Sequence, residues 1–164
     1  MWCADSEAGS TSRAVEDRRL EPLLDPGQLL CAIRGEQVVD HPLTEWVTDL
    51  VAVHKRLATA DAGEISEIDR RRADVVYSID LWIERCVPQH RRGTAMHTET
   101  LGTVIDRIVA GHIHAVQVLM TLDIKRDPRV HAAWHRLAEL VGGYSDLAFE
   151  VVLGRRRLPA PSTA

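Results

Sequence analysis

The sequence predicts an all-α fold, an antiparallel bundle of four main helices preceded by a short N-terminal helix. Apolar residues recur at spacings of three and four along four stretches of roughly 18 to 26 residues, the pattern of amphipathic helices. No stretch keeps the alternation of polar and apolar residues that marks a half-buried strand. The segments between the helical stretches are short, and short connections favour antiparallel neighbours.

Length and composition fit one domain of ordinary size. The 164 residues are 45% hydrophobic and 27% charged, which is typical of a soluble globular protein. A net charge of −4 creates no positive field for nucleic acid. The chain has neither a signal-peptide pattern nor the run of about 20 apolar residues that spans a bilayer. Three widely spaced cysteines, Cys3, Cys31 and Cys86, favour a reduced protein in the cytoplasm, away from membranes.

The chain is expected to begin with a flexible arm over residues 1–22, because this segment is polar and rich in small residues. Asp25 and Pro26 then form a helix-start signal, since Asp can cap the helix and Pro tolerates its first position. These residues predict a short helix over 26–34, which Gly35 ends.

The next two helices are predicted over residues 40–58 and 64–87. Asp40 can cap the first of them, and Pro88 ends the second. We expect the second helix to organise the domain, because its stripe is apolar except at Arg72, which predicts a guanidinium set into the buried face. The stripe consists of Ile65, Ile68, Arg72, Val75, Ile79, Trp82 and Cys86.

The last two helices are predicted over about 97–122 and from Asp127-Pro128 to residue 153. Gly102 and Gly111 lie inside the first of them, where each weakens an isolated helix by about 1 kcal/mol, so we interpret both as points of close helix approach. The final helix is expected to kink or split at Gly142-Gly143. Its stripe is Val130, Trp134, Leu137, Val141, Tyr144, Ala148 and Val151. The bundle domain therefore spans 23–154, followed by a flexible tail over 155–164.

Five charged residues form the main candidate site: Asp69, Arg72, Asp80, Glu99 and Asp106. Asp69 and Arg72 are spaced to pair on one helix face, and Asp80 lies two turns further along. Glu99 and Asp106 are seven residues apart, which puts them on one face of the following helix. A buried guanidinium needs acidic partners. The cluster could fix helix register, form a ligand-binding or catalytic pocket, or be plain surface charge.

Histidines offer weaker alternatives. His131 and His135 are spaced i,i+4 with Glu139 one turn further, a spacing that can place three metal ligands on one face, although a solvent-facing row is the simpler interpretation. The zinc-protease and di-iron patterns are missing, and we expect no cofactor. His112 falls on an apolar face, either as a hydrogen-bonded core residue or as a general base inside a pocket.

The stretch SEIDRRRADVVYSIDLWIE resembles a bacterial all-helical family catalogued as domain of unknown function 4254. The matching residues of this stretch and of the next helix are Arg72, Asp74, Ile79, Asp80, Trp82, Glu99, Gly102, Ile105, Asp106 and Arg107. Weaker matches are Trp46 and Asp49 near its start and Asp146-Leu147 near its end, so the resemblance covers residues 40–154. Asp69 and Arg70 depart from the family's usual Asn-Gln. The resemblance implies a helical cytoplasmic domain and adds Trp46, Asp49, Asp74 and Arg107 to His112 as secondary candidates.

Two functions of different class follow. The first is a non-catalytic module that self-associates, with a dimer favoured, or binds a protein partner, because catalytic signatures are missing and Leu140 and Leu147 lie off the stripe of the last helix. The alternative is a small-molecule-binding protein or enzyme that uses the Arg72 cluster. Nucleic-acid binding is not expected, because the basic runs at 70–72, 91–92 and 155–157 have no interleaved aromatics.

Overall fold

The computed structural model describes residues 22–36, 40–88, 93–122 and 127–161. These residues form an all-α fold, as predicted, with two very short strands. The predicted arm lies outside the described residues except for Pro22. The elements are α2 (Pro26–Arg34), α3 (Pro42–Leu57), α4 (Ile65–Cys86), β1 (Ala95–Met96), α5 (Leu101–Leu122), α6 (Pro128–Val152) and β2 (Arg156–Arg157).

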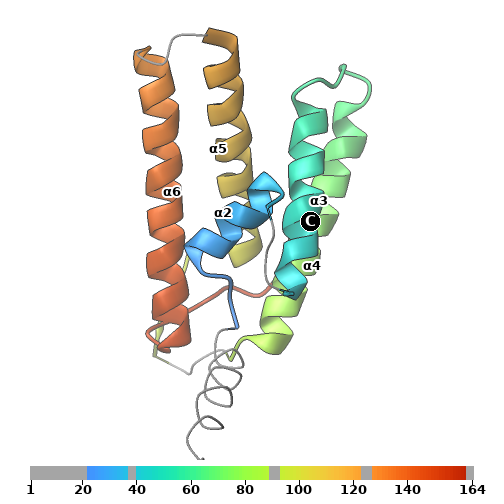
Figure 1. Ribbon diagram of the computed structural model, residues 1–164. Coiled ribbons are helices and arrows are strands. Elements are labelled where there is room, and N and C mark those ends of the chain that lie inside the picture. Colours follow the sequence, from blue (N-terminus) through green and yellow to red (C-terminus); the bar gives the residue numbers. More distant parts are fainter. Residues whose placement is uncertain (1–21, 37–39, 89–92, 123–126, 162–164) are drawn as a thin grey trace, which may run out of the picture.

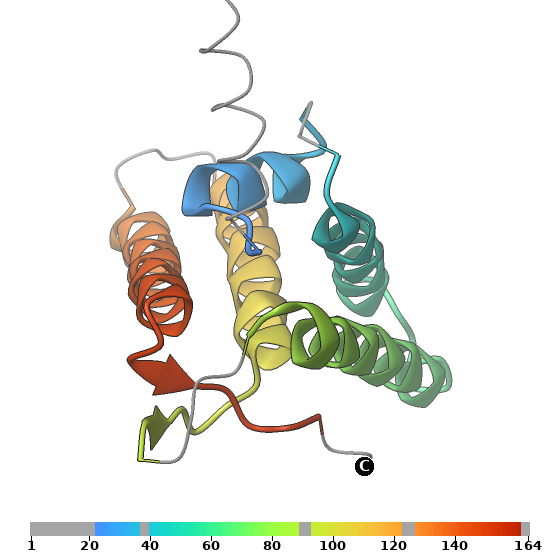
Figure 2. The same ribbon diagram turned by 90° about the horizontal axis from the view of Figure 1, so that it is seen from below.

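Helix α5 is the element around which the others pack. It contacts α3, α4 and α6, and successive helices from α3 to α6 run in opposite directions (Figure 1). Helix α2 crosses over α5 and packs against both α3 and α6 (Figure 2). In the described part α6 packs mainly on α5 and α2 rather than closing a ring with α3 and α4. The organising helix is therefore α5, and not α4 as the sequence suggested.

Capping residues explain where the helices begin and end. The Asp25 carboxylate accepts from the backbone N–H groups of Gly27 and Gln28 at 2.7 and 3.0 Å, and the Gln28 side chain accepts from the Asp25 backbone. This is a reciprocal capping box. Gly35 then ends α2 at a φ of 72°, where a side chain would be strained. The Asp127 side chain caps the start of α6 by accepting from the backbone N–H of Arg129 at 2.8 Å.

Local details differ from the prediction at three places. His41, not Asp40, caps α3, since its Nδ1 accepts from the backbone N–H of Leu43 at 3.1 Å. Helix α6 runs unbroken through Gly142-Gly143, because both glycines face open space and nothing wedges the helix apart. Cys86 is exposed, because the stripe of α4 turns away from the core in its last turn.

The core lies where α2, α3, α4 and α6 surround α5. Tyr144 of α6 is its largest fully buried side chain, and its hydroxyl donates to the backbone carbonyl of Leu24 at 2.6 Å. This bond ties α6 to the segment before α2. The other large, fully buried side chains are Leu24, Leu29, Leu43, Leu50, Ile79, Leu101, Ile105, Ile108, Val47, Val109 and Val151.

Residues 155–161 are not the free tail that the sequence suggested. Gly154, at a φ of 69°, turns the chain after α6, and β2 then pairs in parallel with β1. Leu158 is buried in the core cluster. Each strand is two residues long, too short for alternation to reveal it in the sequence. No described helix combines the length and apolarity needed to cross a bilayer.

Candidate functional site

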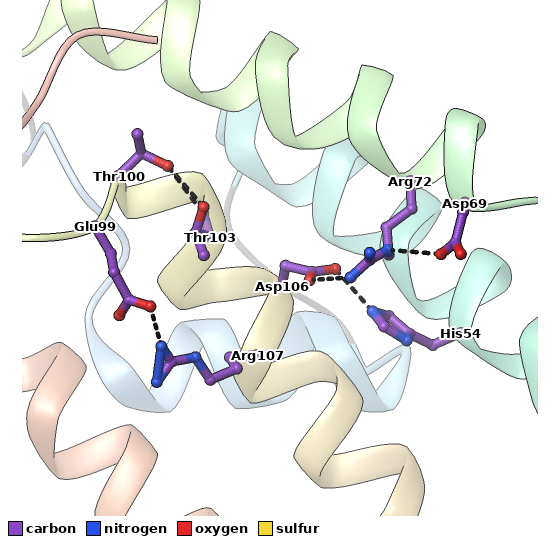
Figure 3. A network of polar contacts seen from close by, with 8 residues as sticks. All are labelled: His54, Asp69, Arg72, Glu99, Thr100, Thr103, Asp106 and Arg107. Atoms are coloured by element: carbon purple, nitrogen blue, oxygen red, sulfur yellow. Dashed lines mark hydrogen bonds and ion pairs between the residues drawn. The ribbon is translucent and has the colours of Figure 1, made fainter. Parts of the chain in front are cut away.

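The carboxylate of Asp106 joins three helices (Figure 3). His54 of α3 donates from Nε2 to Asp106 Oδ1 at 2.8 Å, and Arg72 of α4 donates from Nη1 to Oδ2 at 3.1 Å. Because a carboxylate only accepts hydrogen bonds, the His54 proton lies on Nε2. The side chains of Asp106 and His54 are only 10% and 11% exposed. One acid on α5 therefore holds side chains of both α3 and α4.

Arg72 lies at the rim of this network rather than inside a sealed apolar layer. Its side chain is 39% exposed, and its Nε lies 3.3 Å from Oδ1 of Asp69, which is more exposed still. The acidic partners that a half-buried guanidinium requires are thus present on both sides. The sequence placed Arg72 too deep, because α4 sits at the edge of the fold and one flank of its stripe meets solvent.

Asp80 has a separate task. Its side chain is buried, and its Oδ1 accepts from the backbone N–H of Gly102, at the start of α5, at 2.7 Å. The carboxylate of α4 thereby supplies the N-terminal cap of another helix. Burial raises the pKa of Asp80, while hydrogen bonds from Thr100 and Gly102 partly offset that rise. Asp80 therefore does not join Arg72.

Glu99 also lies outside the network. Helix α5 begins at Leu101, so Glu99 precedes the helix and its side chain pairs with Arg107 (Figure 3). Thr100 accepts from the Thr103 backbone N–H at 3.2 Å, as a capping residue does. The sequence predicted that this helix begins near residue 97, four residues before its actual start. Glu99 therefore does not lie on the helix, and its spacing of seven residues from Asp106 does not place the two side chains on one helix face.

Of the five predicted residues, Asp69, Arg72 and Asp106 come together, and His54 joins them. Sequence reasoning gave His54 no role. The available signal was a polar ring on a face that must pack against α5. A buried histidine needs a hydrogen-bond partner, and Asp106 provides one.

The remaining secondary candidates make other contacts. Asp49 pairs with Arg71 at 3.3 Å, and the Trp46 ring lies 6.4 Å from that of Trp82. Asp74 is exposed. Arg70 pairs with Glu67, so each Arg of the 70–72 run has an acidic neighbour.

The alternative metal row lies on the exposed side of α6. His135 Nδ1 is 3.8 Å from Glu139 Oε1, and His131 is exposed one turn before it. Within the described ranges, no set of three or more His, Cys, Asp or Glu side chains is arranged to hold a metal ion.

His112 is buried, but it is not the hydrogen-bonded core residue that the sequence suggested. Its ring stands edge-on to Trp134, with centroids 6.3 Å apart, and its shielded Nδ1 has no hydrogen-bond partner among the residues that the structure describes. Burial lowers the pKa of His112, and the charges of Arg34 and Lys55 lower it further. His112 lines a hollow of about 440 Å³ between α2, α3 and α5.

Other hollows also lie away from the Asp106 network. One of about 680 Å³ is lined by residues of α5 and α6, and one of about 310 Å³ is lined by Asp80 and by the segment after β2, among others. His54, Arg72 and Asp106 line none of these three. The network therefore connects helices at a place apart from these three hollows.

Comparison with known proteins gives a family but no relative of known activity. No curated protein and no solved structure matches the chain. A family model described as "Protein of unknown function (DUF4254)" matches residues 50–160, which include α4, α5, α6 and both strands. The match covers more than half of the chain, and the chain belongs to this family.

Proposed function

We propose that this protein is a non-catalytic helical module that acts by self-association, as a dimer joined through the C-terminal end of α6. The proposal rests on one observation: Phe149, the single phenylalanine of the chain, is 62% exposed beside Val152 and Leu153, which are also exposed. We call these three residues the end patch. Adjacent exposed apolar side chains on a small protein typically mark an interaction site.

The surroundings of the end patch favour a second copy of the chain as the partner. Phe149 and Val152 line a hollow of about 230 Å³ whose walls also include Leu23, Leu24 and Pro26. A two-fold axis would let each Phe149 enter the hollow of the other protomer, which is the reciprocal geometry of a symmetric dimer. Buried aromatic anchors of this kind supply much of the energy of interfaces.

The end patch replaces the surface that the sequence suggested for self-association. Leu147 is buried within the chain, and Leu140 packs against the core, so neither offers a free apolar face. Both leucines are covered because the face of α6 that contacts α5 and α2 is wider than the main apolar stripe of the helix.

The charged residues support a non-catalytic role. The Asp106 carboxylate is occupied by His54 and Arg72, and the Asp80 carboxylate by the start of α5. Catalytic acids and bases need access to a reacting group. Acids engaged in this way instead fix the register of packed helices, and we assign that role to both.

Light scattering after gel filtration, over a wide range of protein concentration, tests the dimer. We expect the wild type to approach twice the chain mass, and Phe149→Glu to remain monomeric because a charge in the interface cannot be desolvated cheaply. Met120→Glu is the matched control, since Met120 is 78% exposed on α5 and carries the same kind of change. A strictly monomeric wild type contradicts the proposal. So does a dimer that survives Phe149→Glu, whatever the effect of Met120→Glu.

The cellular setting belongs to the same proposal. Cys31 and Cys86 are free thiols, and Cys86 is exposed. We assign the protein to the bacterial cytoplasm, where such thiols stay reduced. Isolation of the chain with Cys86 in a disulfide, from cells lysed in a thiol-blocking reagent, would contradict that assignment.

A further inference from the structure

The hollow between α2, α3 and α5 is built like a ligand site. Its volume of about 440 Å³ falls within the range of roughly 300–1,000 Å³ that is usual for small-molecule pockets. The apolar part of its wall consists of Ile33, Ala58, Ile113 and Val116. Its polar part consists of Arg34, Lys55, Thr59, His112 and Gln117. Among the described residues no carboxylate lines it, so the charge that these residues bring to the hollow is positive.

His112 brings unused hydrogen-bonding capacity to this wall. The residue is only 8% exposed, yet no hydrogen bond to its ring is found within the described part of the chain. A buried polar group normally has a partner, because burial without one costs free energy. Since its pKa is lowered, the ring is neutral near pH 7 and offers one donor and one acceptor.

Two cations stand near His112 from different helices. Lys55 of α3 forms no ion pair with any described residue, and Arg34 of α2 has only a loose contact of 3.8 Å with Glu36. Both charges are close enough to affect the titration of His112. Two cations with weak or missing partners beside an apolar wall favour an anion that carries its own apolar group.

We propose that this hollow binds a small organic anion, a carboxylate on an apolar body. The carboxylate is held by Lys55 and Arg34 with a hydrogen bond from His112, and the body lies against the apolar wall. A carboxylate suits the site because a guanidinium binds it through two parallel hydrogen bonds. This inference goes beyond self-association, since the hollow lies beside the C-terminal half of α3, at the opposite end of the molecule from the end patch (Figure 1).

Calorimetry on the full-length protein tests the proposal with octanoate as the probe. 1-Octanol has the same apolar body without the charge, and octyl phosphate carries a different anionic group. We expect octanoate to bind about tenfold more tightly than octanol, the usual effect of hydrogen bonds to a charged group. Equal binding of octanoate and octanol, or no binding of octanoate, overturns the anion site. Tighter binding of octyl phosphate than of octanoate overturns the carboxylate assignment.

Matched variants test which residues hold the anion. Lys55→Met keeps the aliphatic stem and should weaken octanoate binding about tenfold. Arg56→Met removes the same charge from the next residue of α3, which does not line the hollow, and should leave binding unchanged. An equal loss in both variants would reveal only general electrostatics and would overturn the proposal.

The role of His112 is tested by nuclear magnetic resonance. Octanoate should shift the imidazole ¹⁵N resonances of His112 and leave those of His135, on the exposed face of α6, unchanged. His112→Phe should fold, because the buried ring packs edge-on against Trp134, and should lose octanoate affinity. Unchanged His112 resonances at saturating octanoate overturn the assignment, whether or not the variant folds.

Discussion

Helix α5 meets two neighbours through glycines, and the two contacts differ in kind. At Gly102 an added Cβ would lie 2.6 Å from Asp80 Oδ1 and 2.7 Å from the backbone oxygen of Val76, both on α4. At Gly111 it would lie 3.2 Å from the Cδ1 methyl of Leu140 on α6. A backbone oxygen cannot move without its helix, whereas the end of a leucine side chain can rotate. The contact with α4 is therefore rigid, and the contact with α6 is adaptable.

The polar contacts follow the same division. On the α4 side, carboxylates hold the helices at fixed atoms: Asp80 at the start of α5, and Asp106 between His54 and Arg72. On the α6 side, contacts are mainly apolar and leave a hollow of about 680 Å³ beside Gly111. Hydrogen bonds to charged groups specify position, while apolar packing tolerates rearrangement.

The sharpest test of this comparison places the same substitution at both glycines. Gly102→Ala should destabilise the protein by about 2–3 kcal/mol, because a crowded core position with a rigid wall cannot accept a methyl group. Gly111→Ala should be nearly neutral, since the greater helix propensity of Ala, worth about 1 kcal/mol, offsets a small shift of Leu140. Urea unfolding of both variants measures the difference.

Gly142→Ala serves as the control, because Gly142 lies in α6 with nothing within 4 Å of an added Cβ. The free energy of unfolding of this variant should rise by up to about 1 kcal/mol from helix propensity alone. Equal costs at Gly102 and Gly111, once this reference gain is subtracted, would show that the two contacts of α5 do not differ in rigidity.

The second test compares the inner and outer acids of the Arg72 network. Asp106→Ala removes a buried acceptor from His54 and Arg72 and should cost about 2 kcal/mol, moderated by the partial exposure of Arg72. Asp69→Ala removes an acid at the exposed rim and should cost about 0.5 kcal/mol or less. Chemical denaturation distinguishes the two. A cost at Asp69 as large as that at Asp106 would mean that Arg72 is held from the solvent side.

These contrasts also indicate what the sequence could predict. Helix positions followed from local chemistry: Asp25-Pro26 and Asp127-Pro128 each start a helix where expected, because a capping side chain acts within a few residues. The sequence predicted that a neighbouring helix approaches closely at Gly102 and Gly111, and this prediction is confirmed. The neighbour at each glycine could not be predicted, because it depends on how the helices pack.

The candidate site was predicted only where spacing within one helix decided the geometry. Asp69 and Arg72 meet because they are three residues apart on α4. Asp80 was assigned to Arg72, but it meets the start of α5, a contact that requires knowing where α5 begins. His54 was missed for a similar reason, since its partner Asp106 is 52 residues further along the chain. Contacts between helices depend on tertiary packing, which periodicity does not reveal.

The smallest expected effect concerns the pH dependence of the rigid contact. The pKa of Asp80 is raised in the folded protein, chiefly by burial, so in the window between its unfolded and folded pKa the native state binds more protons than the unfolded state. Stability from this residue is therefore greatest below the unfolded pKa, falls as the pH rises through the folded pKa, and stays lower above it.

Asp80→Asn isolates this effect, because the amide oxygen can still accept from the Gly102 N–H while the side chain no longer titrates. The acids Glu67, Asp127 and Glu150, whose pKa values are lowered by Arg partners, give the opposite slope but are common to both proteins and cancel in the difference. The stability of the variant relative to wild type should rise from about pH 4 towards neutrality and then level off. A flat difference would mean that folding favours neither form of the Asp80 carboxyl, and a difference that falls with pH would mean that the start of α5 favours the ionised form. Either result would show that burial is not the dominant cost at this contact.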